Sequence, residues 1–305
     1  APPAGPRRSA GDILIVNGLA QGFAVLARIL PAHGVEALAV EEPGSTGARD
    51  QLRTWGVATP PVRVDRHGLD VDDLERSGAK AVLVTPAHHY PTGVVLAPER
   101  RRELLEWARA ADGRYVIEDD YDAEYRYDSN PVGSIQPLDP ERVVSGSSIS
   151  KTLAPGLRLG WMVLPPALIE SAVELKAAFD LGTQVLSQAT FSELLRSGGF
   201  DRHLRHSRAR YRRQRAWLAS RLKTEAPELD VSGLDAGLSL CIRADLPDDQ
   251  AVAQRLRAQG VACEALSYYQ QLPHPQRGLV LDINATRERE LEQVLAAIDG
   301  ARATR

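Results

Sequence analysis

The sequence predicts an α/β fold, with a large domain built on a mainly parallel sheet and a smaller C-terminal α+β domain. From Ile13 onward, short β-branched runs alternate with helical segments, which is the pattern of βαβ units. A chain of 305 residues with 43% hydrophobic side chains can bury one large core or two smaller ones. We expect a linker over residues 1–12, the large domain over 13–195 and the small domain over 196–305.

The large domain is expected to begin with a strand, a tight turn and a helix. The strand ILIV ends at Asn17-Gly18, and Ala20, Phe23 and Ala27 then fall on one face of a helix. Pro98 is placed to start a later helix and Gly113 to end it. Further strands are expected at 36–40, 80–84, 115–120 and 158–165, and helices at 46–56 and 98–113.

The C-terminal third is expected to start with a long arginine-rich helix over residues 200–223. Leu204, Tyr211 and Leu218 repeat along it at helical spacing, so one face packs and the arginines occupy a solvated face. Contact with DNA is the alternative role for these arginines, and the net negative charge of the chain disfavours it. Strands are then expected at 236–242, 261–266 and 277–283, and helices at 248–260 and 287–299.

Composition and charge exclude several classes of function. The formal net charge of -3 gives no field that would indicate a nucleic acid or a membrane surface as a partner. The opening APPAGPRRSAGD lacks the apolar core of a secretory signal, and no later apolar run is long enough to span a bilayer. Cys241 and Cys263 lack metal-ligand spacing, which predicts buried thiols and no metal site. We therefore expect a cytoplasmic protein.

The segment GSSISKTLAPGLRLG at 146–160 surrounds one lysine with hydroxyls, glycines and a single arginine. The amine of Lys151 can condense with an aldehyde, Ser148 can donate to a phosphate, and Arg158 can offer it a bidentate fork. Because Ser, Lys and Gly are common in turns, an exposed structural loop is the alternative.

Two further segments strengthen the hypothesis of a phosphorylated aldehyde cofactor. EDDY at 118–121 stands at the end of a predicted strand, where Asp119 could keep a pyridinium nitrogen protonated and Tyr121 could hydrogen-bond a ring hydroxyl. The backbone N–H groups of Gly18 and Leu19 could cradle a phosphate at a helix N-terminus. An acidic turn and an ordinary βα turn are the alternatives.

Three segments, in this order along the chain, resemble those of a known family: TPAHHYPTG, VIEDDYDAEYRYD and GSSISKTLAPGLRLGWMVLPP. Together they resemble fold-type I enzymes that use pyridoxal 5′-phosphate (PLP), and specifically the aminotransferase-like domain of MocR-type bacterial regulators of the GntR superfamily. The resemblance runs from about Ile13 to Ile298, and it includes LSYY at 266–269 and RGLVLDI at 277–283.

The resemblance assigns expected roles to individual residues. Lys151 matches the lysine that forms the internal aldimine, Asp119 the partner of the pyridine nitrogen, and Tyr121 the tyrosine near the ring hydroxyl. The expected phosphate ligands are Ser148, Arg158 and the amides of Gly18 and Leu19.

Other positions are implied less directly by the resemblance. His88 and Tyr90 lie where the family brings side chains toward the ring. Arg277 resembles the arginine that grips a substrate carboxylate, with a surface arginine as the alternative. Relatives usually have an aromatic residue at the position of Ser45, so ring stacking is expected to be lost here or supplied elsewhere.

The chain also departs from the family pattern at its start and near its end. Asp282 and Ile283 stand where relatives read Gly-Tyr, which predicts different substrate contacts. Only residues 1–12 precede the first strand, and the usual winged helix-turn-helix is not in this sequence. Relatives build each site between two subunits, so a homodimer is expected.

The sequence supports two main hypotheses of function. The first is a PLP-dependent aminotransferase that acts on an amino acid or an amine, with Lys151 as the general base that moves the α-proton. The second is the effector-sensing domain of a MocR-type regulator, in which the same exchange shifts a conformational equilibrium. A PLP-free relative that uses the fold only for assembly is a third hypothesis. We favour the enzyme, because nothing in this sequence reads DNA.

Overall fold

The computed structural model describes residues 10–127, 133–233, 236–273 and 276–303. Most of the expected linker, residues 1–9, lies outside the described residues. Ala10–Asp12 form a 3-10 helix that leads directly into the first strand, so the end of the segment expected to be a linker is ordered structure.

The larger sheet confirms the predicted α/β class. Its strands are β1 (Ile13–Val16), β2 (Leu38–Glu42), β3 (Pro61–Asp65), β4 (Gly68–Leu69), β5 (Ala81–Val84), β6 (Tyr115–Asp120), β7 (Val143–Ser148) and β8 (Gly160–Val163). They lie in the order β1-β8-β7-β6-β5-β2-β3-β4. β3, β2, β5, β6 and β7 are parallel neighbours, and β8 lies antiparallel between β7 and β1. β1 therefore runs in the same direction as β7.

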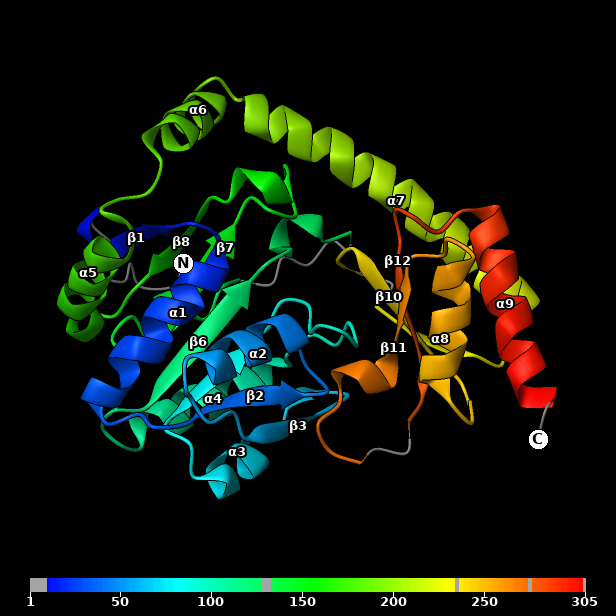
Figure 1. The fold of residues 1–305 in the computed structure, drawn as a ribbon, viewed down its shortest axis with the longest axis horizontal. Helices are drawn as coiled ribbons and strands as arrows, with labels where there is room; N and C mark the ends of the chain where they lie inside the picture. Colours follow the sequence, from blue (N-terminus) through cyan, green and yellow to red (C-terminus); the bar gives the residue numbers. More distant parts are fainter. Residues whose placement is uncertain (1–9, 128–132, 234–235, 274–275, 304–305) are drawn as a thin grey trace.

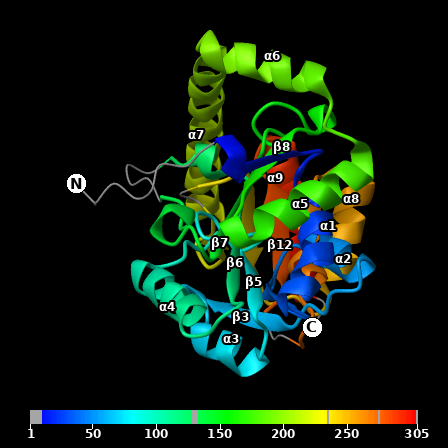
Figure 2. The ribbon, with the colours of Figure 1, turned by 90° about the vertical axis from the view of Figure 1, so that its left-hand side faces the viewer.

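Helices cover both faces of this sheet, as Figure 2 shows. The helices are α1 (Leu19–Ile29), α2 (Thr46–Thr54), α3 (Val71–Ser77), α4 (Pro98–Arg109) and α5 (Pro166–Asp180). Neighbouring strand residues point to opposite cores: Ile117 packs with α1, α2 and α5, whereas Val116 packs with α3 and α4. Burial on both faces explains why the central strands read as continuous apolar runs.

The C-terminal part forms a second, antiparallel sheet beside the first (Figure 1). Its strands are β9 (Asp230–Ser232), β10 (Ser239–Arg243), β11 (Cys263–Ala265) and β12 (Gly278–Asp282), in the order β11-β12-β10-β9. Helices α8 (Asp249–Ala258) and α9 (Glu288–Ala303) pack on this sheet. The long α7 (Gly199–Glu225) runs from α6 (Val185–Arg196) to this second sheet. The expected boundary at residues 195/196 coincides with the end of α6 and stays a prediction.

Several elements differ from the sequence-based expectation. The second strand begins at Leu38 rather than residue 36, and the first helix ends at Ile29 before a 3-10 turn. β3, β4 and α3 were not predicted, because Pro61 and Arg63 interrupt the apolar pattern of β3 and the other two elements are short. Gly146 to Ser148, expected as part of a loop, form the end of β7.

Arg215 is an exception to the predicted solvated arginine face of α7. Its side chain is buried, its Nη1 donates to the carbonyl of Gly237 over 3.0 Å, and its guanidinium lies 4.9 Å from the ring centre of Tyr127. Arg215 therefore fastens α7 to the segment before β10.

The two cysteines are buried free thiols, as predicted, and burial raises the pKa of Cys241 and of Cys263 to about 11. Among the helices that the structure describes, none combines the length and apolar character needed to cross a bilayer.

Replacing Arg215 with Met should lower the free energy of unfolding by roughly 1–3 kcal/mol, because the Gly237 carbonyl loses a donor and the Tyr127 ring loses its cation. Arg213→Met, on the exposed side of the same helix, should change it by less than about 0.5 kcal/mol. Chemical denaturation of both variants measures the difference. Equal effects would contradict the role assigned to Arg215.

Candidate active site

The ends of three strands meet at one edge of the larger sheet. Val16 pairs with Gly160, which pairs on its other side with Ser148, so the ends of β1 and β7 flank the start of β8. One strand further along, Asp119 pairs with Gly146. This is the edge at which open α/β sheets collect their ligands.

Gly18, Ser148 and Arg158 come together at this edge. A Cβ on Gly160 would lie 3.2 Å from Ser148 Cβ and 3.3 Å from Gly18 Cα, so the bare glycine lets β1 and β7 approach. A Cβ on Gly18, whose φ is 73°, would collide with the Arg158 guanidinium. That guanidinium donates from Nη2 to the Asn17 carbonyl over 3.1 Å. Gly18 is therefore close both to Arg158 and, across Gly160, to Ser148.

The two amides predicted to bind phosphate, those of Gly18 and Leu19, differ in their hydrogen bonding. Gly18 N donates to the Val16 carbonyl over 2.9 Å, so this N–H is engaged within the turn. Leu19 begins α1, and the first amides of a helix have no partner within it. The Leu19 amide therefore has no partner within α1, whereas the Gly18 amide is engaged in the turn.

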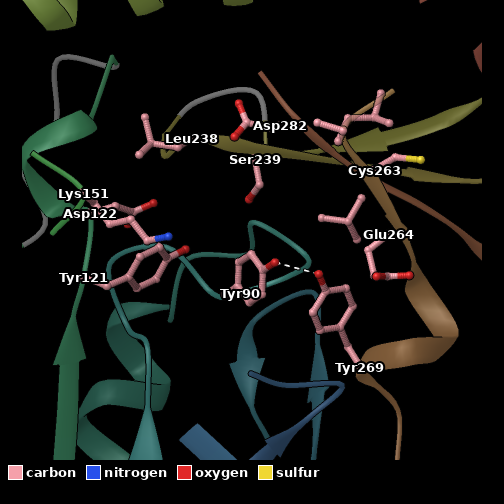
Figure 3. Close-up of a pocket in the computed structure, with 13 residues that line it drawn as sticks. Tyr90, Tyr121, Asp122, Lys151, Leu238, Ser239, Cys263, Glu264, Tyr269 and Asp282 are labelled. Atoms are coloured by element: carbon pink, nitrogen blue, oxygen red, sulfur yellow. Dashed lines mark hydrogen bonds between the residues drawn. The ribbon is translucent and has the colours of Figure 1, made fainter. Parts of the chain in front are cut away.

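Two adjoining cavities open on the same lysine. The Asp119 cavity is lined by Ser45, Thr46, Gly47, Thr85, Tyr90, Asp119, Tyr121, Lys151, Tyr268 and Tyr269. The Asp282 cavity is lined by Tyr90, Tyr121, Asp122, Lys151, Leu238, Ser239, Ala262, Cys263, Glu264, Tyr269, Val280, Leu281 and Asp282 (Figure 3). Lys151 and Asp119 thus share a cavity, although they come from different strand ends.

One carboxylate oxygen of Asp119 lacks a hydrogen-bond partner in the part of the chain that the structure describes. Its Oδ1 is buried and has no hydrogen-bond partner among the described residues. Burial raises its pKa to about 7, Asp120 and Asp122 act in the same direction, and Lys151 opposes them. A positively charged donor would satisfy this oxygen.

Tyr121 is held by a small network behind the cavity wall. Its hydroxyl donates to the His88 carbonyl over 3.1 Å and lies 2.9 Å from His88 Nδ1. His88 Nδ1 is also 3.0 Å from Asp122 Oδ2. His88 is buried and lines neither cavity, so it contacts Tyr121 rather than the open space.

Tyr90 and Ser45 both face the Asp119 cavity. The hydroxyls of Tyr90 and Tyr269 lie 2.7 Å apart, and the Tyr90 ring stands edge-on to Tyr121. Ser45 caps α2 by accepting from Ala48 N over 3.4 Å. Because Ser45 carries no ring, the aromatic surface of this cavity comes from tyrosines.

Arg277 is not brought to either cavity. Its Nη1 lies 3.4 Å from Gln270 Oε1, and no arginine is among the described residues that line the two cavities. The guanidinium fork expected for a substrate carboxylate is therefore absent from these walls.

The sequence analysis missed Glu41 and Thr85. Glu41 Oε2 accepts from Thr85 N over 3.0 Å and from Thr85 Oγ1 over 2.6 Å, and Thr85 lines the Asp119 cavity. Burial raises the pKa of Glu41 to about 8. The signal was available, because Glu41 stands near the end of β2 much as Asp119 does in β6.

Comparisons with known proteins show the family to which this chain belongs. A family model described as aminotransferase class I and II matches residues 5–298. The chain is 32% identical over 88% of its length to the probable rhizopine catabolism regulatory protein MocR of Rhizobium meliloti, and covers 55% of that protein. It is 28% identical over 82% of its length to aromatic-amino-acid aminotransferase 1 of Thermococcus litoralis, and covers 63% of it.

The fold is also similar to a solved structure, the α-aminoadipate aminotransferase LysN of Thermus thermophilus. The TM-score is 0.84 at 24% identity, with 97% of this chain and 79% of that chain covered. The chain spans about half the length of the MocR regulator that it matches.

The raised pKa of Asp119 predicts a pH-dependent stability for the cofactor-free protein. The folded state keeps a proton that the unfolded state releases above about pH 4, so stability falls as pH rises toward about 7. Asp119→Asn removes the carboxyl group and with it this loss of stability. The free energy of unfolding of the variant, relative to that of wild type, should therefore increase by roughly 1–3 kcal/mol between about pH 5 and pH 8.

Denaturant unfolding at the two pH values measures this change. Asp112→Asn, a matched substitution at an exposed aspartate, should show no such gain. A constant difference between Asp119→Asn and wild type across the pH range would contradict a raised Asp119 pKa.

Proposed function

Because this chain belongs to the aminotransferase class I and II family, we propose that it binds PLP at Lys151 and acts on an amino acid or an amine. One observation carries the proposal: Lys151 lines the same cavity as Asp119, whose Oδ1 has no hydrogen-bond partner among the described residues. A primary amine and a carboxylate across one cavity match the aldehyde and the pyridine nitrogen of this cofactor.

The residues present fit the ring of the cofactor. When bound, PLP supplies an electron sink for the substrate carbon next to the amine. The Asp119 carboxylate would hold the proton on the ring nitrogen, which gives its buried Oδ1 the missing partner. The Tyr121 hydroxyl, fixed by His88, would face the ring hydroxyl. The Lys151 amine would accept and return the proton of the substrate carbon.

The strand ends fit the phosphate. Arg158 would offer its guanidinium, Ser148 its hydroxyl and Leu19 its helix-terminal amide, and all three come from the edge where β1 and β7 end. The bare Gly18 leaves space against Arg158 that a side chain would fill. The similar LysN structure is a complex with N-(5′-phosphopyridoxyl)-L-leucine, which supports a cofactor of this class here.

A second candidate function is effector sensing within a longer regulator. It is favoured by the 32% identity to a MocR regulator of which this chain covers 55%. The two functions share the cofactor site and differ in whether the bound ligand is converted.

Assembly and location complete the proposal. We propose a homodimer, because Leu181, Val185 and Leu186 are 95%, 75% and 71% exposed next to one another before and within α6.

The free thiols of Cys241 and Cys263 support a reducing, cytoplasmic location. The division into residues 13–195 and 196–305 is proposed as the domain organisation, since each part has its own sheet and core.

Adding PLP to the purified protein should produce an absorbance band that shifts away from that of free PLP, because the amine bonds to the aldehyde. Lys151→Ala should abolish the shifted band. Lys223→Ala, at an exposed lysine of α7, should keep it. Loss of the band in both variants, or in neither, would contradict attachment at Lys151.

The same spectrum separates the two candidate functions. An enzyme should convert the band to that of pyridoxamine phosphate when an amino donor is added in excess. A sensor should show a ligand-dependent change that reverses on dialysis, without pyridoxamine phosphate.

Gly18→Ala should weaken PLP binding by about tenfold, because the new methyl group displaces the guanidinium of Arg158. Gly56→Ala is the matched control: Gly56 also has a positive φ, 82°, but a methyl group there meets nothing within 4 Å. Titration of the absorbance band gives both dissociation constants. Equal weakening would mean that backbone strain alone explains the effect.

A further inference from the structure

His88 and Asp122 form a buried pair directly behind Tyr121. Their exposed fractions are 2% and 3%, and the contact between them is made within one chain. His88 Nδ1 lies 3.0 Å from Asp122 Oδ2 and 2.9 Å from the Tyr121 hydroxyl oxygen. One ring nitrogen therefore stands between a carboxylate and a phenol, and its proton decides how the phenol is hydrogen-bonded.

The surroundings of the His88 ring favour a proton on Nδ1. The other ring nitrogen, Nε2, is buried and has no hydrogen-bond partner among the described residues. A proton on Nε2 would be buried without an acceptor, whereas a proton on Nδ1 meets the carboxylate of Asp122. Asp122 thus selects the tautomer in which Nδ1 is the donor.

A protonated Nδ1 fixes the direction of the hydrogen bond at Tyr121. The Tyr121 oxygen then accepts from His88, so that its own proton has to go to another acceptor. In this structure that acceptor is the His88 carbonyl, at 3.1 Å. A bare Nδ1 would instead take the hydroxyl proton, and Tyr121 would have none to offer to the cavity.

Glycine backbone encloses the His88 ring. A Cβ on Gly237 would lie 2.1 Å from His88 Cε1 and 2.7 Å from Asp122 Oδ2, and a Cβ on Gly93 would lie 3.3 Å from His88 Nε2. Gly237 is itself held in place, because its N–H donates to the Tyr125 carbonyl over 2.8 Å. The ring therefore has little room to turn away from the carboxylate.

Tyr121 keeps its own proton in this setting. Burial raises the pKa of its hydroxyl well above the usual range, and the charges of Asp122 and Asp119 act in the same direction. The titratable groups that bond, contact or act electrostatically on Tyr121 are His88, Tyr90, Asp119 and Asp122, and Lys151 lines the same cavities. Tyr121 is therefore available as a neutral donor rather than as an anion.

We propose that His88 is a positioning residue that makes Tyr121 a hydrogen-bond donor toward the cofactor, with Asp122 holding the proton on His88 Nδ1. The acceptor would be the oxygen of the ring hydroxyl of PLP. This inference rests on the proposed function, because that function places the ring hydroxyl opposite Tyr121. A donor at this oxygen favours its negatively charged form, which lowers the pH at which the bound cofactor loses its proton.

Replacing His88 with Leu removes the Nδ1 donor, so the Tyr121 proton is no longer directed to the cofactor. The pH midpoint of the PLP absorbance band should therefore rise by about one unit, a tenfold change in proton affinity. Tyr121→Phe should raise the midpoint by a similar amount, and the double variant should show no further rise, because both changes remove the same hydrogen bond. Absorbance spectra of the PLP-loaded protein across a pH range measure the midpoint.

Two further variants separate this role from a loss of packing. His88→Asn has an amide nitrogen that can donate from near the position of Nδ1, and it should keep the midpoint closer to that of wild type than His88→Leu does. His33→Leu removes an imidazole that is also bonded to a hydroxyl, that of Ser171, and should leave the midpoint unchanged. No rise after His88→Leu, or a rise that persists in the Tyr121→Phe background, would overturn the inference.

Nuclear magnetic resonance of the cofactor-free protein, with isotope-labelled histidine, tests the tautomer without PLP. The nitrogen chemical shifts of His88 should show the proton on Nδ1, and Asp122→Asn should increase the share of the Nε2 tautomer, because the charge that holds the proton is gone. A proton on Nε2 in the wild type would overturn the inference whether or not PLP binds. A missing PLP band with the proton on Nδ1 would contradict the proposed cofactor but keep the arrangement of Asp122, His88 and Tyr121.

Discussion

The candidate site depends on one buried carboxylate oxygen, Oδ1 of Asp119, to which no described residue donates a hydrogen bond. Asp119 stands at the end of β6, on the sheet edge next to the end of β7, and its Oδ1 finds no donor among the described residues. Burying such a group costs free energy unless a positive charge or a donor meets it. The larger sheet is stabilised elsewhere, by apolar cores on both faces, and can carry this cost at one edge. A bound cation or protonated ring would offset the cost locally.

The strand directions determine which side chains can reach that edge. Because β8 runs antiparallel between β7 and β1, the first strand of the chain ends at the same edge as β5, β6 and β7. Gly160 lets Ser148 and Gly18 approach across β8, and Arg158 lies just before it. Residues separated by about half of the chain are thus neighbours, through backbone pairing rather than through a flexible loop.

The sequence predicted the parts of this arrangement that follow from local pattern. The strands around Ile117 and Leu83 and the helix over residues 98–109 have clear apolar periods and were found. The rule for strand ends indicated the neighbourhoods of Gly18 and Asp119, whereas Lys151 was singled out by its loop of hydroxyls and glycines and by the family resemblance. What failed depends on tertiary contact: Arg215 is buried because Gly237 and Tyr127 happen to meet it, and no spacing within α7 reveals that. The position of Arg277 outside the lining of the two cavities likewise depends on tertiary contacts that the local pattern does not show.

The two cavities are lined by residues from different sheets. Asp119, Thr85 and Ser45 belong to segments of the larger sheet, whereas Glu264, Val280 and Asp282 belong to β11 and β12 of the smaller one. Lys151 and three tyrosines line both. A change on β11 or β12 can therefore alter which ligand fits without moving the carboxylate on β6. The charges are separated in the same way: Arg158 lies at the strand edge where β1 and β7 end, and the carboxylates of Glu264 and Asp282 line the cavity on the side of the smaller sheet.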